Sequence, residues 1–93
     1  MNQYHNAEVI KLLDAPTISA LFRLYGINYD SIAFRLRQTR QAIVYKQKHD
    51  SWKPYERQLV YELLKQHGLE STELILINKM ANTSKKRKWV TSE

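Results

Sequence analysis

The only two glycines and the only two prolines of the chain bracket two helical patterns, and this spacing constrains the fold strongly. Pro16 follows Asp14, a residue type that caps helix N-termini. Gly26 lies where the helix opened by Pro16 should end in a left-handed cap. Pro54 opens a second helix, which Gly68 ends. Apolar residues recur at helical spacing between these breaks, so the sequence predicts a mostly α-helical fold.

Each predicted helix carries one apolar face that should pack into a common core. The inward residues are Ile18, Leu21, Phe22 and either Leu24 or Tyr25 after Pro16, and Leu59, Val60, Leu63 and Leu64 after Pro54. The segment NAEVIKLL fits a further short helix capped by Asn6. A length of 93 residues suffices for one domain, and the chain has no repeat or linker. We expect residues 1–93 to form a single compact domain of four to five helices.

The segment after Gly68 is compatible with two structures. Ser71 can cap a helix, whereas the four consecutive apolar residues from Leu74 to Ile77 are typical of a strand buried on both faces. The polar run NTSKKR then leads into KWVTS, which also has the composition of a strand. Residues 73–91 are therefore expected to form either a further helix or a β-hairpin, with a basic tail or hairpin tip at 83–93. The helix agrees better with the rest of the chain.

Composition and charge narrow the possible functions. The formal net charge is +6, from 15 Lys and Arg against 9 Asp and Glu, which favours a polyanionic partner, usually nucleic acid. Cysteine is absent, which excludes disulfides, thiolate metal sites and cysteine nucleophiles. The three histidines, His5, His49 and His67, are far apart and have no companions at metal-ligand spacing. We therefore expect no metal, no cofactor and no catalytic residue, and a protein that is not an enzyme.

The sequence predicts neither a secretory signal peptide nor a membrane-spanning segment. The N-terminal segment MNQYHNAEV lacks the basic and apolar regions of a signal peptide. No apolar run reaches the length needed to cross a bilayer. The expected location is the cytoplasm, with no membrane partner.

The central stretch YDSIAFRLRQTRQAIVYKQ, residues 29–47, contains two helical patterns separated at RQT. The small side chain of Ala33 allows a crossing helix to approach closely, and Thr39 can cap the second helix. The inward residues are Ile32, Ala33 and Leu36 in the first helix, and Ala42 and Ile43 in the second. The spacing predicts two short helices joined by a tight turn, a motif of about residues 29–48.

This pattern resembles the Cro/repressor-like helix-turn-helix family of phage and bacterial regulators. The similarity covers roughly residues 16–66 and is closest over 26–45, where GINYDSIAFRL resembles the supporting helix and TRQAIV the recognition helix. Where the family usually has glycine in the turn, this chain has Arg37, and Lys46 stands where the family has a large apolar residue. The aliphatic part of the Lys46 side chain can pack on the core while its ammonium group points to solvent. Alternatively, the helix is shifted and Tyr45 packs inward.

The resemblance implies roles for side chains on the outer face of the second helix. Four residues are expected to contact bases, namely Arg40, Gln41, Val44 and Tyr45, because arginine pairs with guanine, glutamine with adenine, and an apolar group with the thymine methyl. Phosphate contacts are expected from Tyr29, Thr39 and Lys48. The basic run KKRK adds Lys85, Lys86, Arg87 and Lys88 to the phosphate contacts.

These features predict a sequence-specific transcriptional regulator that binds double-stranded DNA. Because repression is the commonest activity in the family it resembles, a repressor is expected. One recognition helix reads only a few base pairs, so a homodimer on an inverted repeat is expected. The expected dimer interface is Leu74, Ile75, Leu76 and Ile77.

Two other functions remain open. One is a protein-interaction module, such as an antirepressor that uses this apolar surface to bind a regulatory protein. The other is an architectural or recombination accessory factor that relies on KKRK.

Overall fold

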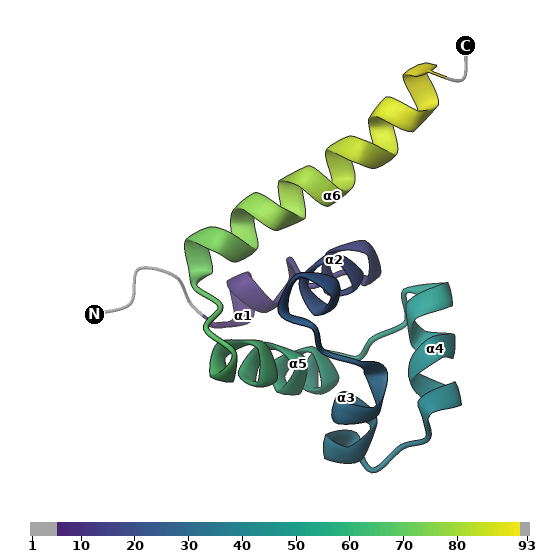
Figure 1. Ribbon diagram of the computed structural model, residues 1–93, viewed down its shortest axis with the longest axis vertical. Helices are drawn as coiled ribbons and strands as arrows, with labels where there is room; N and C mark the ends of the chain where they lie inside the picture. Colours follow the sequence, from purple (N-terminus) through teal and green to yellow (C-terminus); the bar gives the residue numbers. More distant parts are fainter. Residues whose placement is uncertain (1–5, 92–93) are drawn as a thin grey trace.

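The computed structural model describes the backbone of residues 6–91 and the side chains of residues 8–83 (Figure 1). Over this range the backbone forms six helices and no strand, so the protein is mostly α-helical as predicted, with one helix more than the expected four to five. The helices are α1 (Asn6–Ile10), α2 (Ala15–Tyr25), α3 (Tyr29–Leu36), α4 (Arg40–His49), α5 (Pro54–Gln66) and α6 (Ser71–Thr91). Residues 73–91, for which helix and hairpin were both open, lie within α6.

The predicted signals at the ends of α2 are confirmed. The Asp14 carboxylate accepts a hydrogen bond of 3.0 Å from the backbone N–H of Thr17. Gly26 has a φ of 67°, a left-handed conformation that glycine adopts without steric cost. At the same end of the helix Leu24 is exposed, whereas Tyr25 is half-buried against the core. Tyr25 is therefore the residue that completes the inner face of α2.

One hydrophobic core joins all six helices and the connectors between them. Its buried members are Val9, Ile10, Leu13, Ile18, Leu21, Phe22, Ile27, Ile32, Ala33, Ile43, Trp52, Val60, Tyr61, Leu63, Leu64, Leu69 and Leu74. Figure 1 shows α3 and α4 on the side of the molecule that faces away from α6. The short helix α4 contributes a single buried residue, Ile43, so most of its surface remains outside the core.

The first half of α6 is fastened to α1 and α2. The amide of Asn78 donates to the Leu12 carbonyl oxygen at 2.8 Å and to the Thr17 hydroxyl at 3.1 Å. The Tyr25 hydroxyl donates to the Glu73 carboxylate, and this bond raises the pKa of Tyr25 to about 12. The early turns of α6 are thus part of the domain, while Figure 1 shows its later turns extending away from the other helices.

Helical geometry divides the apolar run of α6 between the core and the surface. Leu74 is fully buried in the single chain, so its prediction as a dimer-interface residue is wrong: its side chain is already covered by the other helices. Ile75 and Ile77 are half-buried. Leu76 and Met80, one turn apart, are 56% and 55% exposed. The apolar surface that α6 offers to a partner is therefore centred on Leu76 and Met80.

Truncating Leu74 should destabilise the domain far more than truncating the exposed Leu24. We expect Leu74→Ala to lower the free energy of unfolding by about 2–5 kcal/mol because it leaves a cavity in the core. Leu24→Ala, at an exposed position of α2, should change it by at most about 0.5 kcal/mol. Urea unfolding followed by circular dichroism measures both. Equal effects of the two substitutions would contradict the packing of α6 on the core.

Candidate nucleic-acid interface

The turn between α3 and α4 forms as the sequence predicts. Asn28 caps α3 by accepting from the Ser31 backbone N–H at 3.2 Å, and Thr39 caps α4 by accepting from the Ala42 backbone N–H at 3.1 Å. Arg37 ends α3 in the left-handed conformation, with a φ of 56°. A non-glycine residue in this region costs on the order of 1 kcal/mol, which the surrounding hydrogen bonds can offset. The chain therefore makes a tight turn without glycine.

Packing fixes which side of α4 faces outward. Ile43 is fully buried, as are Ile32 and Ala33 of α3, so the two helices cross at small and branched apolar side chains. Ala42 is half-buried beside them. Because successive residues of a helix are rotated by about 100°, the residues on the side opposite Ile43 point to solvent.

The four predicted base-contact residues are all exposed on α4: Gln41 and Tyr45 lie opposite Ile43, and Arg40 and Val44 lie on one flank. Arg40 and Gln41 are exposed in its first turn, and Val44 and Tyr45 follow one turn later, 44% and 61% exposed. The Tyr45 ring lies against the His49 ring, with centroids 4.2 Å apart. The alternative in which Tyr45 packs inward is therefore wrong. The arrangement presents a guanidinium, an amide and two larger apolar groups on one short surface.

Arg40 has a partner within the chain that the sequence analysis missed. Its guanidinium lies 3.3 Å from the carboxylate of Asp30, in the first turn of α3. Both side chains are more than half exposed, and ion pairs of this kind contribute about 0–1 kcal/mol. The pair can therefore open readily, leaving the Arg40 guanidinium available to another acceptor.

The predicted phosphate contacts divide into three groups. Thr39 and Lys48 are exposed at the two ends of α4. Tyr29 is half-buried, with its ring 5.8 Å from that of Phe22, and its hydroxyl accepts from the Gln47 amide at 3.2 Å, so the hydroxyl proton can still be donated. The side chains of the basic run, namely Lys85, Lys86, Arg87 and Lys88, lie outside the described side chains.

A hollow of about 280 Å³ adjoins the N-terminus of α3. It is lined by Ser19, Phe22, Arg23, Ile27, Asn28, Tyr29 and Arg40, and we call it the α2–α3 hollow. Arg23 was not among the predicted contacts, because it lies far along the chain from α4 and only the fold brings it near. Two guanidinium groups beside a helix N-terminus form a favourable environment for an anion.

Hydrogen bonds hold the C-terminal end of α4 against the start of α2. The Gln47 amide donates to the Ala15 carbonyl oxygen at 3.1 Å and accepts from the Trp52 indole N–H at 2.8 Å. The Asp50 carboxylate accepts from the Ala15 backbone N–H at 2.9 Å. None of these three polar side chains was singled out from the sequence. Together they fix the direction of α4 relative to α2.

A buried carboxylate connects the turn, α4 and α5. Glu56 is 1% exposed and accepts from the Lys53 backbone N–H at 2.9 Å and from the Gln38 amide at 3.0 Å. The Lys46 ammonium lies 3.0 Å from the same carboxylate. The expectation that Lys46 directs its charge outward is therefore wrong: its side chain is 15% exposed, and its charge faces the buried carboxylate.

Hydrogen bonding decides the charge state of Glu56. Burial alone raises the pKa of the carboxyl, but the hydrogen bonds from Lys53, Gln38 and Lys46 and the charge of Lys46 outweigh it. The net result is a pKa below the ordinary value of 4.5. Glu56 is therefore an ionised acceptor at neutral pH, which matches its three donors.

The described part of the chain holds no group of three or more His, Cys, Asp or Glu side chains that could bind a metal ion. It also contains no helix with the length and apolar character required to cross a membrane. The chain matches no protein-family model, and it shows no significant similarity to any curated protein or solved structure. Its function is accordingly inferred from its own residues.

Replacing Glu56 with glutamine should loosen the α3–α4 unit. Glu56→Gln turns an amide N–H₂ toward the Gln38 amide and the Lys46 ammonium, which are themselves donors, and leaves a buried charge unpaired. We expect a loss of about 3 kcal/mol in the free energy of unfolding at neutral pH. Glu62→Gln, at an exposed position of the same helix, is the matched control and should change it by at most about 0.5 kcal/mol.

The same pair of variants tests the linkage to pH. Because the pKa of Glu56 is lower in the folded state, its stabilising effect is complete above the ordinary value of 4.5 and disappears as the pH falls through the folded pKa. Urea unfolding from about pH 7 to about pH 3 should therefore show the wild type and Glu56→Gln converging in stability toward the acid end. A constant difference over this range would contradict an ionised Glu56.

Proposed function

We propose that this protein is a sequence-specific regulator of transcription that binds double-stranded DNA through a helix-turn-helix formed by α3 and α4. In this proposal it belongs with the Cro/repressor-like regulators, and α4 is the recognition helix. The observation that carries the proposal is the division of α4 into two sides. Ile43 anchors one side in the core, Gln41 and Tyr45 lie opposite it, and Arg40 and Val44 are exposed on one flank.

The chemistry of the outer side suits the major groove, which is wide enough for one α-helix. The Arg40 guanidinium can donate two hydrogen bonds to guanine, and the Gln41 amide can both donate to and accept from adenine. Val44 and Tyr45 offer apolar contact to the thymine methyl. A helix that has no binding partner on its exposed side would not require this combination of a guanidinium, an amide and apolar groups.

Phosphate contacts would hold α4 in register along the groove. Thr39, Lys48 and the Tyr29 hydroxyl flank the recognition surface, and Arg23 joins them at the α2–α3 hollow. The net charge of +6 supports attraction to a polyanion, and the basic run at 85–88 would add non-specific affinity. In this proposal Asp30 releases Arg40 when a base or phosphate oxygen takes its place.

A dimer follows from the small size of the recognition surface. Two copies related by a two-fold axis would read the half-sites of an inverted repeat about one helical turn apart. We assign the contact between copies to Leu76 and Met80, bordered by Ile75 and Ile77, since Leu74 is occupied within the chain. Covering a promoter in this way would repress transcription.

Selection from a pool of random duplexes, followed by sequencing, tests the proposal against its rivals. Enrichment of an inverted repeat is the expected result. Retention of DNA without any motif would contradict sequence-specific regulation and favour an architectural factor. Failure to retain DNA would contradict both and favour a protein-interaction module that binds through α6.

Removing the Arg40 side chain should relax base preference at one position of the selected site. We expect Arg40→Ala to cost about 1–3 kcal/mol on that site and little on unrelated DNA, because a paired base contact is lost. Lys48→Ala should instead weaken binding to all duplexes alike and reduce the salt slope by about 1. Fluorescence anisotropy at several salt concentrations distinguishes the two. Unchanged discrimination by folded Arg40→Ala protein would refute α4 as the reader.

A charge placed at Leu76 should separate the two copies. We expect Leu76→Lys to sediment as a folded monomer at concentrations where the wild type is a dimer, because it buries an unpaired charge in the contact. Leu24→Lys is the matched control, since Leu24 on α2 is 57% exposed and Leu76 is 56% exposed. Analytical ultracentrifugation gives the masses. The assignment fails if the Leu24 variant dissociates and the Leu76 variant does not.

A further inference from the structure

A second hollow lies between the end of α1 and the start of α5, and no residue of α3 or α4 lines it. Its lining residues are Ile10, Lys11, Pro54, Tyr55, Arg57 and Gln58, its volume is about 540 Å³, and we call it the α1–α5 pocket. Ligand pockets in proteins commonly measure about 300–1,000 Å³ and combine an apolar wall with a few polar groups. The pocket thus has the size of a small-molecule site.

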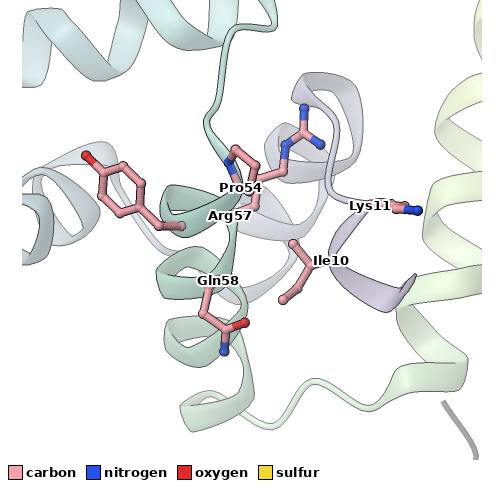
Figure 2. Close-up of a pocket in the computed structure, with 6 residues that line it drawn as sticks. Ile10, Lys11, Pro54, Arg57 and Gln58 are labelled. Carbon is pink, nitrogen blue, oxygen red and sulfur yellow. The ribbon is translucent and has the colours of Figure 1, made fainter. Parts of the chain in front are cut away.

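The apolar wall comes from both helices. The Ile10 side chain is nearly buried and points from α1 toward the space beside α5, as Figure 2 shows. Pro54 contributes its ring, and the exposed Tyr55 adds an aromatic surface at the edge. An apolar ring or short chain would cover the exposed surfaces of Pro54 and Tyr55, which favours binding.

The polar part of the pocket is cationic. Arg57 and Gln58 extend from α5 in opposite directions in Figure 2, and Lys11, directly after α1, extends away from α5. The Nε of Arg57 is buried and has no hydrogen-bond partner within the described structure. Neither Arg57 nor Lys11 takes part in the ion pairs of the described residues, which join other side chains.

A buried donor such as the Arg57 Nε–H is unfavourable unless an acceptor meets it. A carboxylate is the acceptor whose two oxygens match the guanidinium geometry. We infer that the α1–α5 pocket binds a small amphipathic carboxylate, with its apolar group on Ile10 and Pro54 and its carboxylate at Arg57. This site is independent of the proposed DNA-binding function.

The test is a titration of the full ¹⁵N-labelled chain, followed by NMR, with two probes of nearly equal shape that differ only in a carboxylate or a neutral amide. N-acetylphenylalanine carries a carboxylate beside a phenyl ring, and N-acetylphenylalaninamide is its neutral match. We expect saturable shifts at Ile10, Lys11, Arg57 and Gln58, including the Arg57 side-chain N–H, with the acid bound about tenfold more tightly than the amide.

Variants of Arg57 separate charge from geometry. Arg57→Gln should reduce affinity for the acid to that for the amide, and Arg57→Lys should give an intermediate value. Lys65→Gln removes one charge from an exposed position farther along α5 and should leave the affinity unchanged.

Three results would overturn the inference. They are equal binding of acid and amide, an equal loss of affinity in the Lys65 and Arg57 variants, and shifts that are absent or lie outside the pocket. A hexapeptide with C-terminal phenylalanine that binds much more tightly than N-acetylphenylalanine would assign the pocket to a protein terminus and overturn the small-ligand inference.

Discussion

The buried carboxylate of Glu56 is the interaction on which the arrangement of α3, α4 and α5 depends. It receives one donor from the turn before α4, one from α4 itself and one from the backbone that begins α5, all at 2.9–3.0 Å. Because a buried carboxylate requires donors, any movement of α4 away from α5 would leave a charge unpaired in the interior. The apolar contacts of Ile43 hold α4 against the core. The hydrogen bonds and the ion pair of Glu56 further restrict the position of α4 relative to α5.

Gln47 and Asp50 hold the C-terminal end of α4 against α2. Their hydrogen bonds reach Ala15 at the start of α2, so the two ends of a ten-residue helix are held by different partners. Inward-facing polar groups thus orient the helix. Gln41, Val44 and Tyr45 take no part in holding it, and Arg40 contributes only its exposed ion pair with Asp30. A rigidly oriented surface binds with a smaller loss of conformational freedom than a mobile one, which suits the recognition role proposed for α4.

Local signals in the sequence predicted much of this fold. The caps at Asp14 and Thr39, and the left-handed residue at Gly26, depend on neighbours within three or four positions, and all of them form as expected. The side of α4 that faces outward was also predictable, because the buried Ile43 fixes the helical phase. The geometry of the proposed recognition surface therefore follows from short-range rules.

Long-range polar contacts were not predictable in the same way. Nothing in the sequence distinguishes Glu56 from an exposed glutamate, since its burial depends on Gln38 and Lys46 arriving from other segments. The same holds for the apolar residues from Leu74 to Ile77. Their composition predicts burial, but the contact of α6 with α2 determines that Leu74 is buried and Leu76 is exposed. Arg23 and Arg57 likewise acquire their surroundings only in the folded chain.

The central claim is that the outer side of α4 is the surface that meets DNA. The most direct measurement is an NMR titration of the ¹⁵N-labelled chain with a short DNA duplex, which follows backbone amides and the side-chain N–H groups of arginine and glutamine. The account predicts that the largest changes occur from Thr39 to Tyr45, including the side chains of Arg40 and Gln41. Changes confined to α6 or to the α1–α5 pocket, with α4 unaffected, would contradict it.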